Sequence, residues 1–156
     1  MKKILVAVMA LVALCACNSG EKKDLAYRGL SMGLPFQTFI DSLAARGFAI
    51  DSAKTDSAFQ MVVMGSDAVR YRLVIAQKDG QVAALQENWN LHSNDSTRKL
   101  WQQMRDEFEK ELGAWPNMPK HGDDHKVAKF EGEGGFITLT LENTYRPTLA
   151  VRYDRK

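Results

Sequence analysis

Apolar residues recur at helical spacing in two segments of the chain. Between residues 35 and 46, positions i, i+3, i+4 and i+7 are all apolar: Phe36, Phe39, Ile40 and Leu43. This spacing predicts a helix with one buried face, in which Pro35 suits the first turn and Gly47 suits the residue after the end. A second apolar stripe predicts a helix over residues 95–112, ended by Gly113.

Runs rich in β-branched and aromatic residues predict strands elsewhere. Four short strands are expected between the helices, among them 58–64, 69–77 and 82–91, and three after the second helix, at 126–131, 136–142 and 148–153. Short turns join consecutive strands, so the strands must be antiparallel. The predicted fold class is α+β, an antiparallel sheet of about six to seven strands with two helices packed on one face. The predicted order is helix–four strands–helix–three strands.

The strongest turn signal is Asp79-Gly80, which predicts a two-residue hairpin. An uninterrupted register from this turn places Arg72 opposite Glu87. By the same register Arg70 faces Trp89, on the sheet face away from the helices. A tryptophan beside arginines on an open sheet is typical of a binding surface, whereas the alternative is a cross-strand ion pair with a tryptophan covering the sheet. The candidate binding residues are Arg70, Arg72, Glu87 and Trp89.

Residues 1–16 differ from the rest of the chain. Two lysines precede an uncharged apolar run, which is typical of a secretory signal peptide and too short to span a bilayer. The stretch Leu14-Cys15-Ala16-Cys17 resembles the lipobox of bacterial lipoproteins. Cys17 has a leucine three places before it and a small residue directly before it, whereas Cys15 follows the bulky Leu14. The resemblance implies that Cys17 becomes the first mature residue and carries lipid chains; the alternative is a plain signal peptide cleaved nearby.

Without the leader, the mature part has a different net charge and length from the whole chain. The chain has 21 basic and 19 acidic residues, and two of the lysines belong to the leader, which leaves 19 of each sign. A balanced charge lacks the electrostatic footprint of a nucleic-acid binder, so no nucleic-acid partner is expected. About 140 residues fit a single domain. The predicted organisation is a signal peptide at 1–16, a lipidated cysteine and tether at 17–24, and one domain at 25–156.

The residues around Cys17 also bear on location. Asn18 follows it where an aspartate would favour retention at the inner membrane, and no acidic run follows that would favour surface display. We therefore expect a lipid anchor in the outer membrane, facing the periplasm, with an envelope protein as a candidate partner. The mature part has no other cysteine, which excludes disulfides, cysteine-zinc sites and thiol nucleophiles.

Two motifs suggest chemistry. Residues 29–33 match G-x-S-x-G around Ser31, the nucleophile elbow of α/β-hydrolases. That fold needs a long parallel sheet, so a turn whose glycines lead into the first helix is the preferred interpretation. Residues 121–125 carry His121, His125 and two aspartates, which are metal-ligand types, but nearby prolines and a glycine favour a solvated loop. No cofactor, metal or catalytic residue is predicted, and the alternative is a small hydrolase using Ser31 or a metal at the His121–His125 loop.

Several stretches resemble a group of small, uncharacterised Bacteroidetes-type lipoproteins. They are Tyr27 to Gly33, Leu43 to Phe48, Leu100 to Pro116 and the Gly-Gly-x-Ile-x-Leu strand at 134–139. The resemblance rests on turn glycines, helix stripes and strand cores, so it implies no catalytic residues. A fainter likeness of topology relates the chain to the α-then-β-hairpin modules of the outer-membrane assembly lipoprotein and β-lactamase-inhibitor folds, and fold does not imply function. The predicted function is that of a membrane-anchored periplasmic lipoprotein, a non-catalytic binding or envelope-accessory module.

Overall fold

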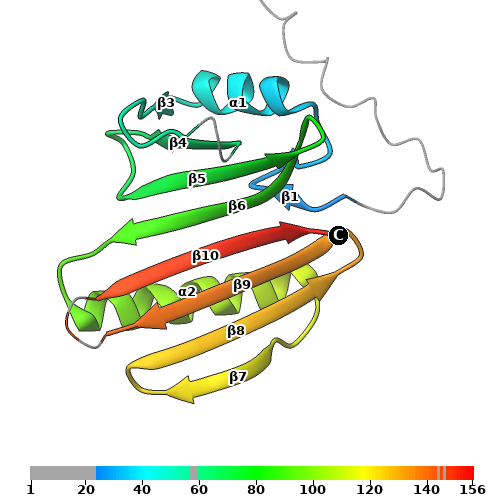
Figure 1. The fold of residues 1–156 in the computed structure, drawn as a ribbon. Coiled ribbons are helices and arrows are strands. Elements are labelled where there is room, and N and C mark those ends of the chain that lie inside the picture. Colours follow the sequence, from blue (N-terminus) through cyan, green and yellow to red (C-terminus); the bar gives the residue numbers. More distant parts are fainter. Residues whose placement is uncertain (1–23, 57–59, 144, 146) are drawn as a thin grey trace, which may run out of the picture.

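The computed structural model describes residues 24–56, 60–143, 145 and 147–156 (Figure 1). The predicted signal peptide, Cys17 and all of the predicted tether except Asp24 lie outside the described residues, as does the start of the strand predicted at 58–64. Within the described part, no helix has the length and apolar character needed to cross a membrane.

The described chain is mostly sheet, with 48% of its residues in strands and 23% in helices. In chain order the elements are β1 (Ala26–Tyr27), β2 (Leu30–Ser31), α1 (Phe36–Ala45), β3 (Ala49–Ile50), β4 (Met61–Gly65), β5 (Tyr71–Lys78), β6 (Gln81–Asn90), α2 (Asn94–Leu112), β7 (Asn117–Gly122), β8 (His125–Gly132), β9 (Gly135–Glu142) and β10 (Thr148–Arg155). The main sheet has eight strands in the order β3-β4-β5-β6-β10-β9-β8-β7, all antiparallel, and β1 and β2 form a separate hairpin.

The main sheet is built from two halves of the same design. Each half is a helix followed by four strands, and each set of strands is ordered as a meander. The last strands of the halves, β6 and β10, pair antiparallel at the centre of the sheet (Figure 1). One continuous core of buried side chains includes residues of both helices, such as Phe39 and Trp101, and of the central strands, such as Leu85 and Leu139.

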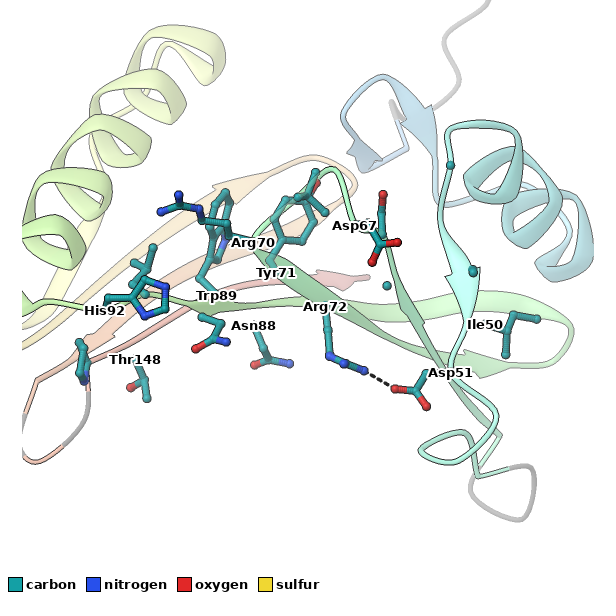
Figure 2. A pocket seen from close by; sticks show the side chains of 18 residues that line it. Ile50, Asp51, Asp67, Arg70, Tyr71, Arg72, Asn88, Trp89, His92 and Thr148 are labelled. Carbon is teal, nitrogen blue, oxygen red and sulfur yellow. Dashed lines mark hydrogen bonds and ion pairs between the residues drawn. The ribbon is translucent and has the colours of Figure 1, made fainter.

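The two predicted helices are confirmed, and the glycines lie after their ends as expected, but Pro35 is the N-cap of α1 and does not lie in its first turn. At the end of α1 the N–H of Phe48 donates to the carbonyl of Leu43, and Gly47 has a φ of 87°, which completes a Schellman motif. The side chain of Ser93 caps the start of α2, and Gly113 follows its end with a φ of 63°. Figure 2 shows both helices on the same side of the sheet.

The predicted fold class is wrong in its strand number, its order and its balance of helix and strand. The chain is mostly sheet, and eight strands rather than six or seven form the main sheet. The extra strand after α2 is β7, in a segment where Pro119 and Gly122 favoured a loop. Because β7 is an exposed edge strand, a proline there removes no hydrogen bond that the sheet requires. The two-residue strands β1, β2 and β3 are too short to produce a periodic signal.

The register of the β5–β6 hairpin also differs from the prediction. The turn pairs Lys78 with Gln81 as expected, but a β-bulge lies two residues further on. Gln77 pairs with Val82 and the preceding residue pairs with Ala84, so Ala83 is an extra residue in β6. One extra residue on one strand moves every later side chain to the opposite face.

The bulge therefore overturns the predicted pairs Arg72–Glu87 and Arg70–Trp89. Glu87 lies opposite Leu73 instead, on the face that packs against the helices, and Trp89 lies opposite Tyr71 on the same face.

Candidate functional site

A pocket of about 1040 Å³ lies where β5 begins and β6 ends, close to the β9–β10 loop. We call it the strand-end pocket, and six of its lining residues define it: Ile50, Asp51, Arg70, Arg72, Trp89 and His92. Its volume is at the upper end of the range for small-molecule sites, and its open shape also suits part of a protein surface. Figure 2 shows its side chains arriving from β3, β5, β6 and the segment after β6.

The structure brings three of the four predicted binding residues to this pocket and separates the fourth. Arg70, Arg72 and Trp89 line the pocket, whereas Glu87 does not. Figure 2 shows Arg72 and the neighbouring Asn88 directed away from the helices, while Trp89 is directed towards them. The pocket thus extends around the end of the strands and is not a patch on one sheet face.

The charged side chains of the pocket are of two kinds. Arg72 is paired with Asp51, whose carboxylate is also 3.8 Å from the Lys54 ammonium. The side chains of Asp67, Arg70 and His92 are exposed, and none of them forms a hydrogen bond or ion pair with another described residue. Arg70 and His92 can therefore donate hydrogen bonds to a bound molecule without first breaking an interaction within the protein.

Glu87 is the most deeply buried charged residue of the described chain, with 1% of its surface exposed. One carboxylate oxygen accepts a hydrogen bond from the Tyr27 hydroxyl at 2.8 Å and from Arg28 Nε at 3.1 Å, and Arg28 Nη2 is also 3.1 Å away. The other oxygen accepts from Trp89 Nε1 at 2.9 Å. A buried carboxylate is stable only when hydrogen-bond donors and a counter-charge compensate for the loss of water in this way.

The β1–β2 hairpin delivers Arg28 to Glu87. Arg28 and Gly29 form its two-residue turn with φ values of 48° and 79°, the positive values that a type I′ turn requires. The Arg28 guanidinium lies over the rings of Tyr27 and Tyr71, at 5.7 and 5.4 Å from their centroids. Burial alone would lower the pKa of Arg28, but the adjacent Glu87 carboxylate more than offsets this effect and raises the pKa.

Trp89 connects this buried network with the strand-end pocket. Its indole N–H is bound to Glu87, and its ring is 4.5 Å from that of Tyr71, which also lines the pocket. The hydrogen bond fixes the orientation of the indole ring, so the aromatic wall of the pocket is held from behind by a fully matched carboxylate. The pocket therefore has a preformed aromatic side and an exposed, unpaired cation at Arg70.

Burial in the core also raises the pKa of two tyrosines near Glu87. Desolvation raises the pKa of the Tyr27 and Tyr153 phenols, and the Glu87 carboxylate raises both further. A folded chain therefore keeps these phenols protonated at a pH where an unfolded chain has ionised them. Since the folded state then binds more protons, stability is complete below about pH 10 and falls as the pH rises beyond it.

Replacing Tyr153 by phenylalanine is expected to reduce this alkaline sensitivity. Each buried phenol contributes about 1.4 kcal/mol per pH unit above the ordinary tyrosine pKa. Between pH 9 and pH 11 the parent should lose about 1.4 kcal/mol more free energy of unfolding than Tyr153→Phe, measured by urea denaturation. The matched control is Tyr145→Phe. Because Tyr145 is 94% exposed, its replacement should leave the dependence of the free energy of unfolding on pH unchanged. Equal losses in parent and Tyr153→Phe would contradict the prediction.

Ser31 does not lie on a strand-to-helix elbow. It belongs to β2 and pairs with Ala26 of β1. Its hydroxyl accepts a hydrogen bond from the Gly33 N–H at 3.0 Å and is 3.5 Å from the Asp24 carboxylate. Within the described residues, no hydrogen bond joins Ser31 to a histidine that would serve as a general base.

The two histidines of the predicted loop lie on paired strands. His121 is in β7 and His125 begins β8, where Gly122 pairs with His125. His125 Nε2 lies 3.3 Å from the Lys120 ammonium and 3.2 Å from a Glu142 carboxylate oxygen. Among the described residues, no group of three or more histidines, cysteines or acids is placed to hold a metal ion.

The sequence interpretation missed residues that the structure makes central. It placed Tyr27 and Arg28 in a stretch of structural resemblance only, and it assigned no role to His92. One signal was available for Glu87: the apolar residues Val82 and Leu85 are three apart in the sequence, a spacing that conflicts with strict alternation and is compatible with a bulge between them. Nothing local to Arg28 indicates its partner, which lies 59 positions away.

No protein family, curated protein or solved structure matches the chain.

Proposed function

We propose that the chain is a lipid-anchored binding module of the cell envelope, which binds a protein partner at the strand-end pocket. The observation that carries this proposal is the composition of that pocket. It combines unpaired Arg70 and His92 with a rigid pair of aromatic rings and with Ile50, which is 52% exposed. Arginine, tryptophan and tyrosine are the residues that most often dominate the free energy of protein–protein binding.

The lipobox supports the envelope as the place of binding. If lipid is attached at Cys17, residues 17–23 connect the bilayer to the first described residue, Asp24. Even fully extended, a segment of that length reaches only roughly 25 Å. The domain would therefore meet partners within or close to the membrane that holds it.

The proposal is tested with a photo-crosslinking amino acid in the full chain, in the cells that produce it. We expect a label at Asn88, which is exposed in the pocket, to form a covalent adduct with one defined protein. A label at Gln103, exposed on α2 outside the pocket, is the matched control and should not form it. Adding Arg70→Glu should reduce the Asn88 adduct by about fivefold or more, because it reverses the unpaired charge.

Three results would contradict the proposal. The first is that the Asn88 label forms no adduct, and the second is that the Gln103 label forms the same adduct in equal yield. The third is that Arg70→Glu leaves the adduct yield unchanged, which would mean that the partner does not bind at the strand-end pocket.

A further inference from the structure

A second pocket lies on the helix side of the sheet, between the β1–β2 hairpin, the C-terminal half of α2 and the β8–β9 turn. We call it the hairpin pocket. It has a volume of about 430 Å³. Six of its lining residues are apolar or aromatic: Leu25, Met104, Phe108, Leu112, Ile137 and Tyr153. A concave site with apolar walls and few polar groups is the usual form of a small-molecule site.

Acidic residues outnumber basic ones in the hairpin pocket, whose charged lining residues are Asp24, Arg28, Glu87, Glu107, Glu111 and Glu133. Glu107, Glu111 and Glu133 are exposed, and none of their side chains forms a hydrogen bond or ion pair with another described residue. Arg28 also lines the pocket, but it is paired with Glu87, so the Glu107, Glu111 and Glu133 carboxylates have no cation paired with them.

Two of these carboxylates lie at electrostatically unfavourable positions on α2. Glu107 and Glu111 are four residues apart on α2, so their like charges lie on neighbouring turns and repel. Glu111 is also in the last helical turn, where the unpaired carbonyls give the helix end a negative potential. A cation placed between them would relieve both effects.

The arrangement favours an organic cation over a metal ion. A metal needs several ligand atoms around one point, and no described group of three acids, histidines or cysteines is placed to provide them. An ammonium group on a hydrocarbon stem needs only a nearby negative potential for its head and an apolar wall for its stem. Phe108, Leu112 and Ile137 provide that wall.

We infer that the hairpin pocket binds a primary ammonium group carried on a short aliphatic stem. The stem lies against the apolar wall and the ammonium group lies between Glu107, Glu111 and Glu133. Free polyamines and the lysine side chain of a partner share this chemistry. The inference does not depend on the strand-end pocket, because no lining residue of the hairpin pocket lines the other.

The test uses the full chain in a non-ionic detergent, titrated with n-butylammonium and followed by the amide chemical shifts of α2 and the β1–β2 hairpin. We expect saturable shifts that 1-butanol and butyrate do not produce. The variant Glu107→Gln with Glu111→Gln should weaken binding by about tenfold or more. Glu133→Gln, which lies in the β8–β9 turn, removes the third charge without touching the helix and should also weaken it.

The matched control is Asp106→Asn with Glu109→Gln. It removes the same number of charges from the same helix, but these residues lie outside the hairpin pocket. Its affinity for n-butylammonium should stay within about twofold of the parent. Equal binding of butyrate or 1-butanol, no loss in either pocket variant, or an equal loss in the control would overturn the inference. Spermidine and Nα-acetyl-lysine methylamide then distinguish the two sources, because the natural one should bind more tightly than n-butylammonium.

Discussion

Replacing Glu87 by glutamine is expected to lower the free energy of unfolding by about 3 kcal/mol, because it removes the acceptor at the centre of a buried network. Tyr27, Arg28 and Trp89 all direct donors at the two carboxylate oxygens. A glutamine keeps the shape of the side chain, but it has only one oxygen. Whichever way the amide is turned, its NH₂ group faces another donor, and Arg28 loses its counter-charge. Chemical denaturation of the full chain measures this loss.

The control for this prediction is Trp89→Phe. It removes the single donor of one Glu87 oxygen but keeps Arg28, Tyr27 and an aromatic ring beside Tyr71, so we expect a smaller loss, of about 2 kcal/mol. If Glu87→Gln cost no more than Trp89→Phe, the carboxylate would not organise the network. The aromatic side of the strand-end pocket would then need another support.

Replacing Cys17 by alanine is expected to abolish lipid attachment and to release the chain from the membrane fraction. Each buried CH₂ of an acyl chain contributes about 0.8 kcal/mol to membrane binding, and stable anchoring takes more than one chain. Removing the only site that fits the lipobox would remove that entire contribution. Labelled palmitate incorporation and membrane fractionation both measure the change.

The sequence offers a matched control two residues earlier. Cys15→Ala removes a thiol from the same segment, but Cys15 follows Leu14 and does not fit the lipobox. It should retain both the label and the membrane association. A labelled Cys17→Ala chain, or loss of the label in Cys15→Ala, would contradict the proposed anchor.

The helices could be predicted from the sequence because their signals are local. The stripe from Phe36 to Leu43 and the glycine at 47 fix α1 without reference to the rest of the chain, and Gly113 does the same for the end of α2. The exposed edge strand β7 could not be predicted in this way. Its side chains are largely exposed, so it lacks the apolar alternation that marks a half-buried strand.

The candidate site could be predicted only in part, for a related reason. Arg70, Arg72 and Trp89 do lie at one pocket, but the face assigned to Glu87 and Trp89 was wrong. A single extra residue, Ala83, exchanges the two faces for all later side chains of β6. A turn motif fixes the register next to the turn, whereas a bulge further along depends on how both faces of the finished sheet pack. The partner Arg28 comes from a distant hairpin, which no local pattern could have indicated.

The pairing of β6 with β10 has a consequence for the order in which the chain is made. The strand β6 is complete at Asn90, but its partner begins only at Thr148, after a whole helix and three further strands. Until then the first half presents one side of β6 as a row of unpaired N–H and C=O groups, which is the kind of edge that recruits strands from other molecules. The finished sheet hides this edge at its centre. The nascent chain therefore depends on reaching its last strand before it meets another copy of itself.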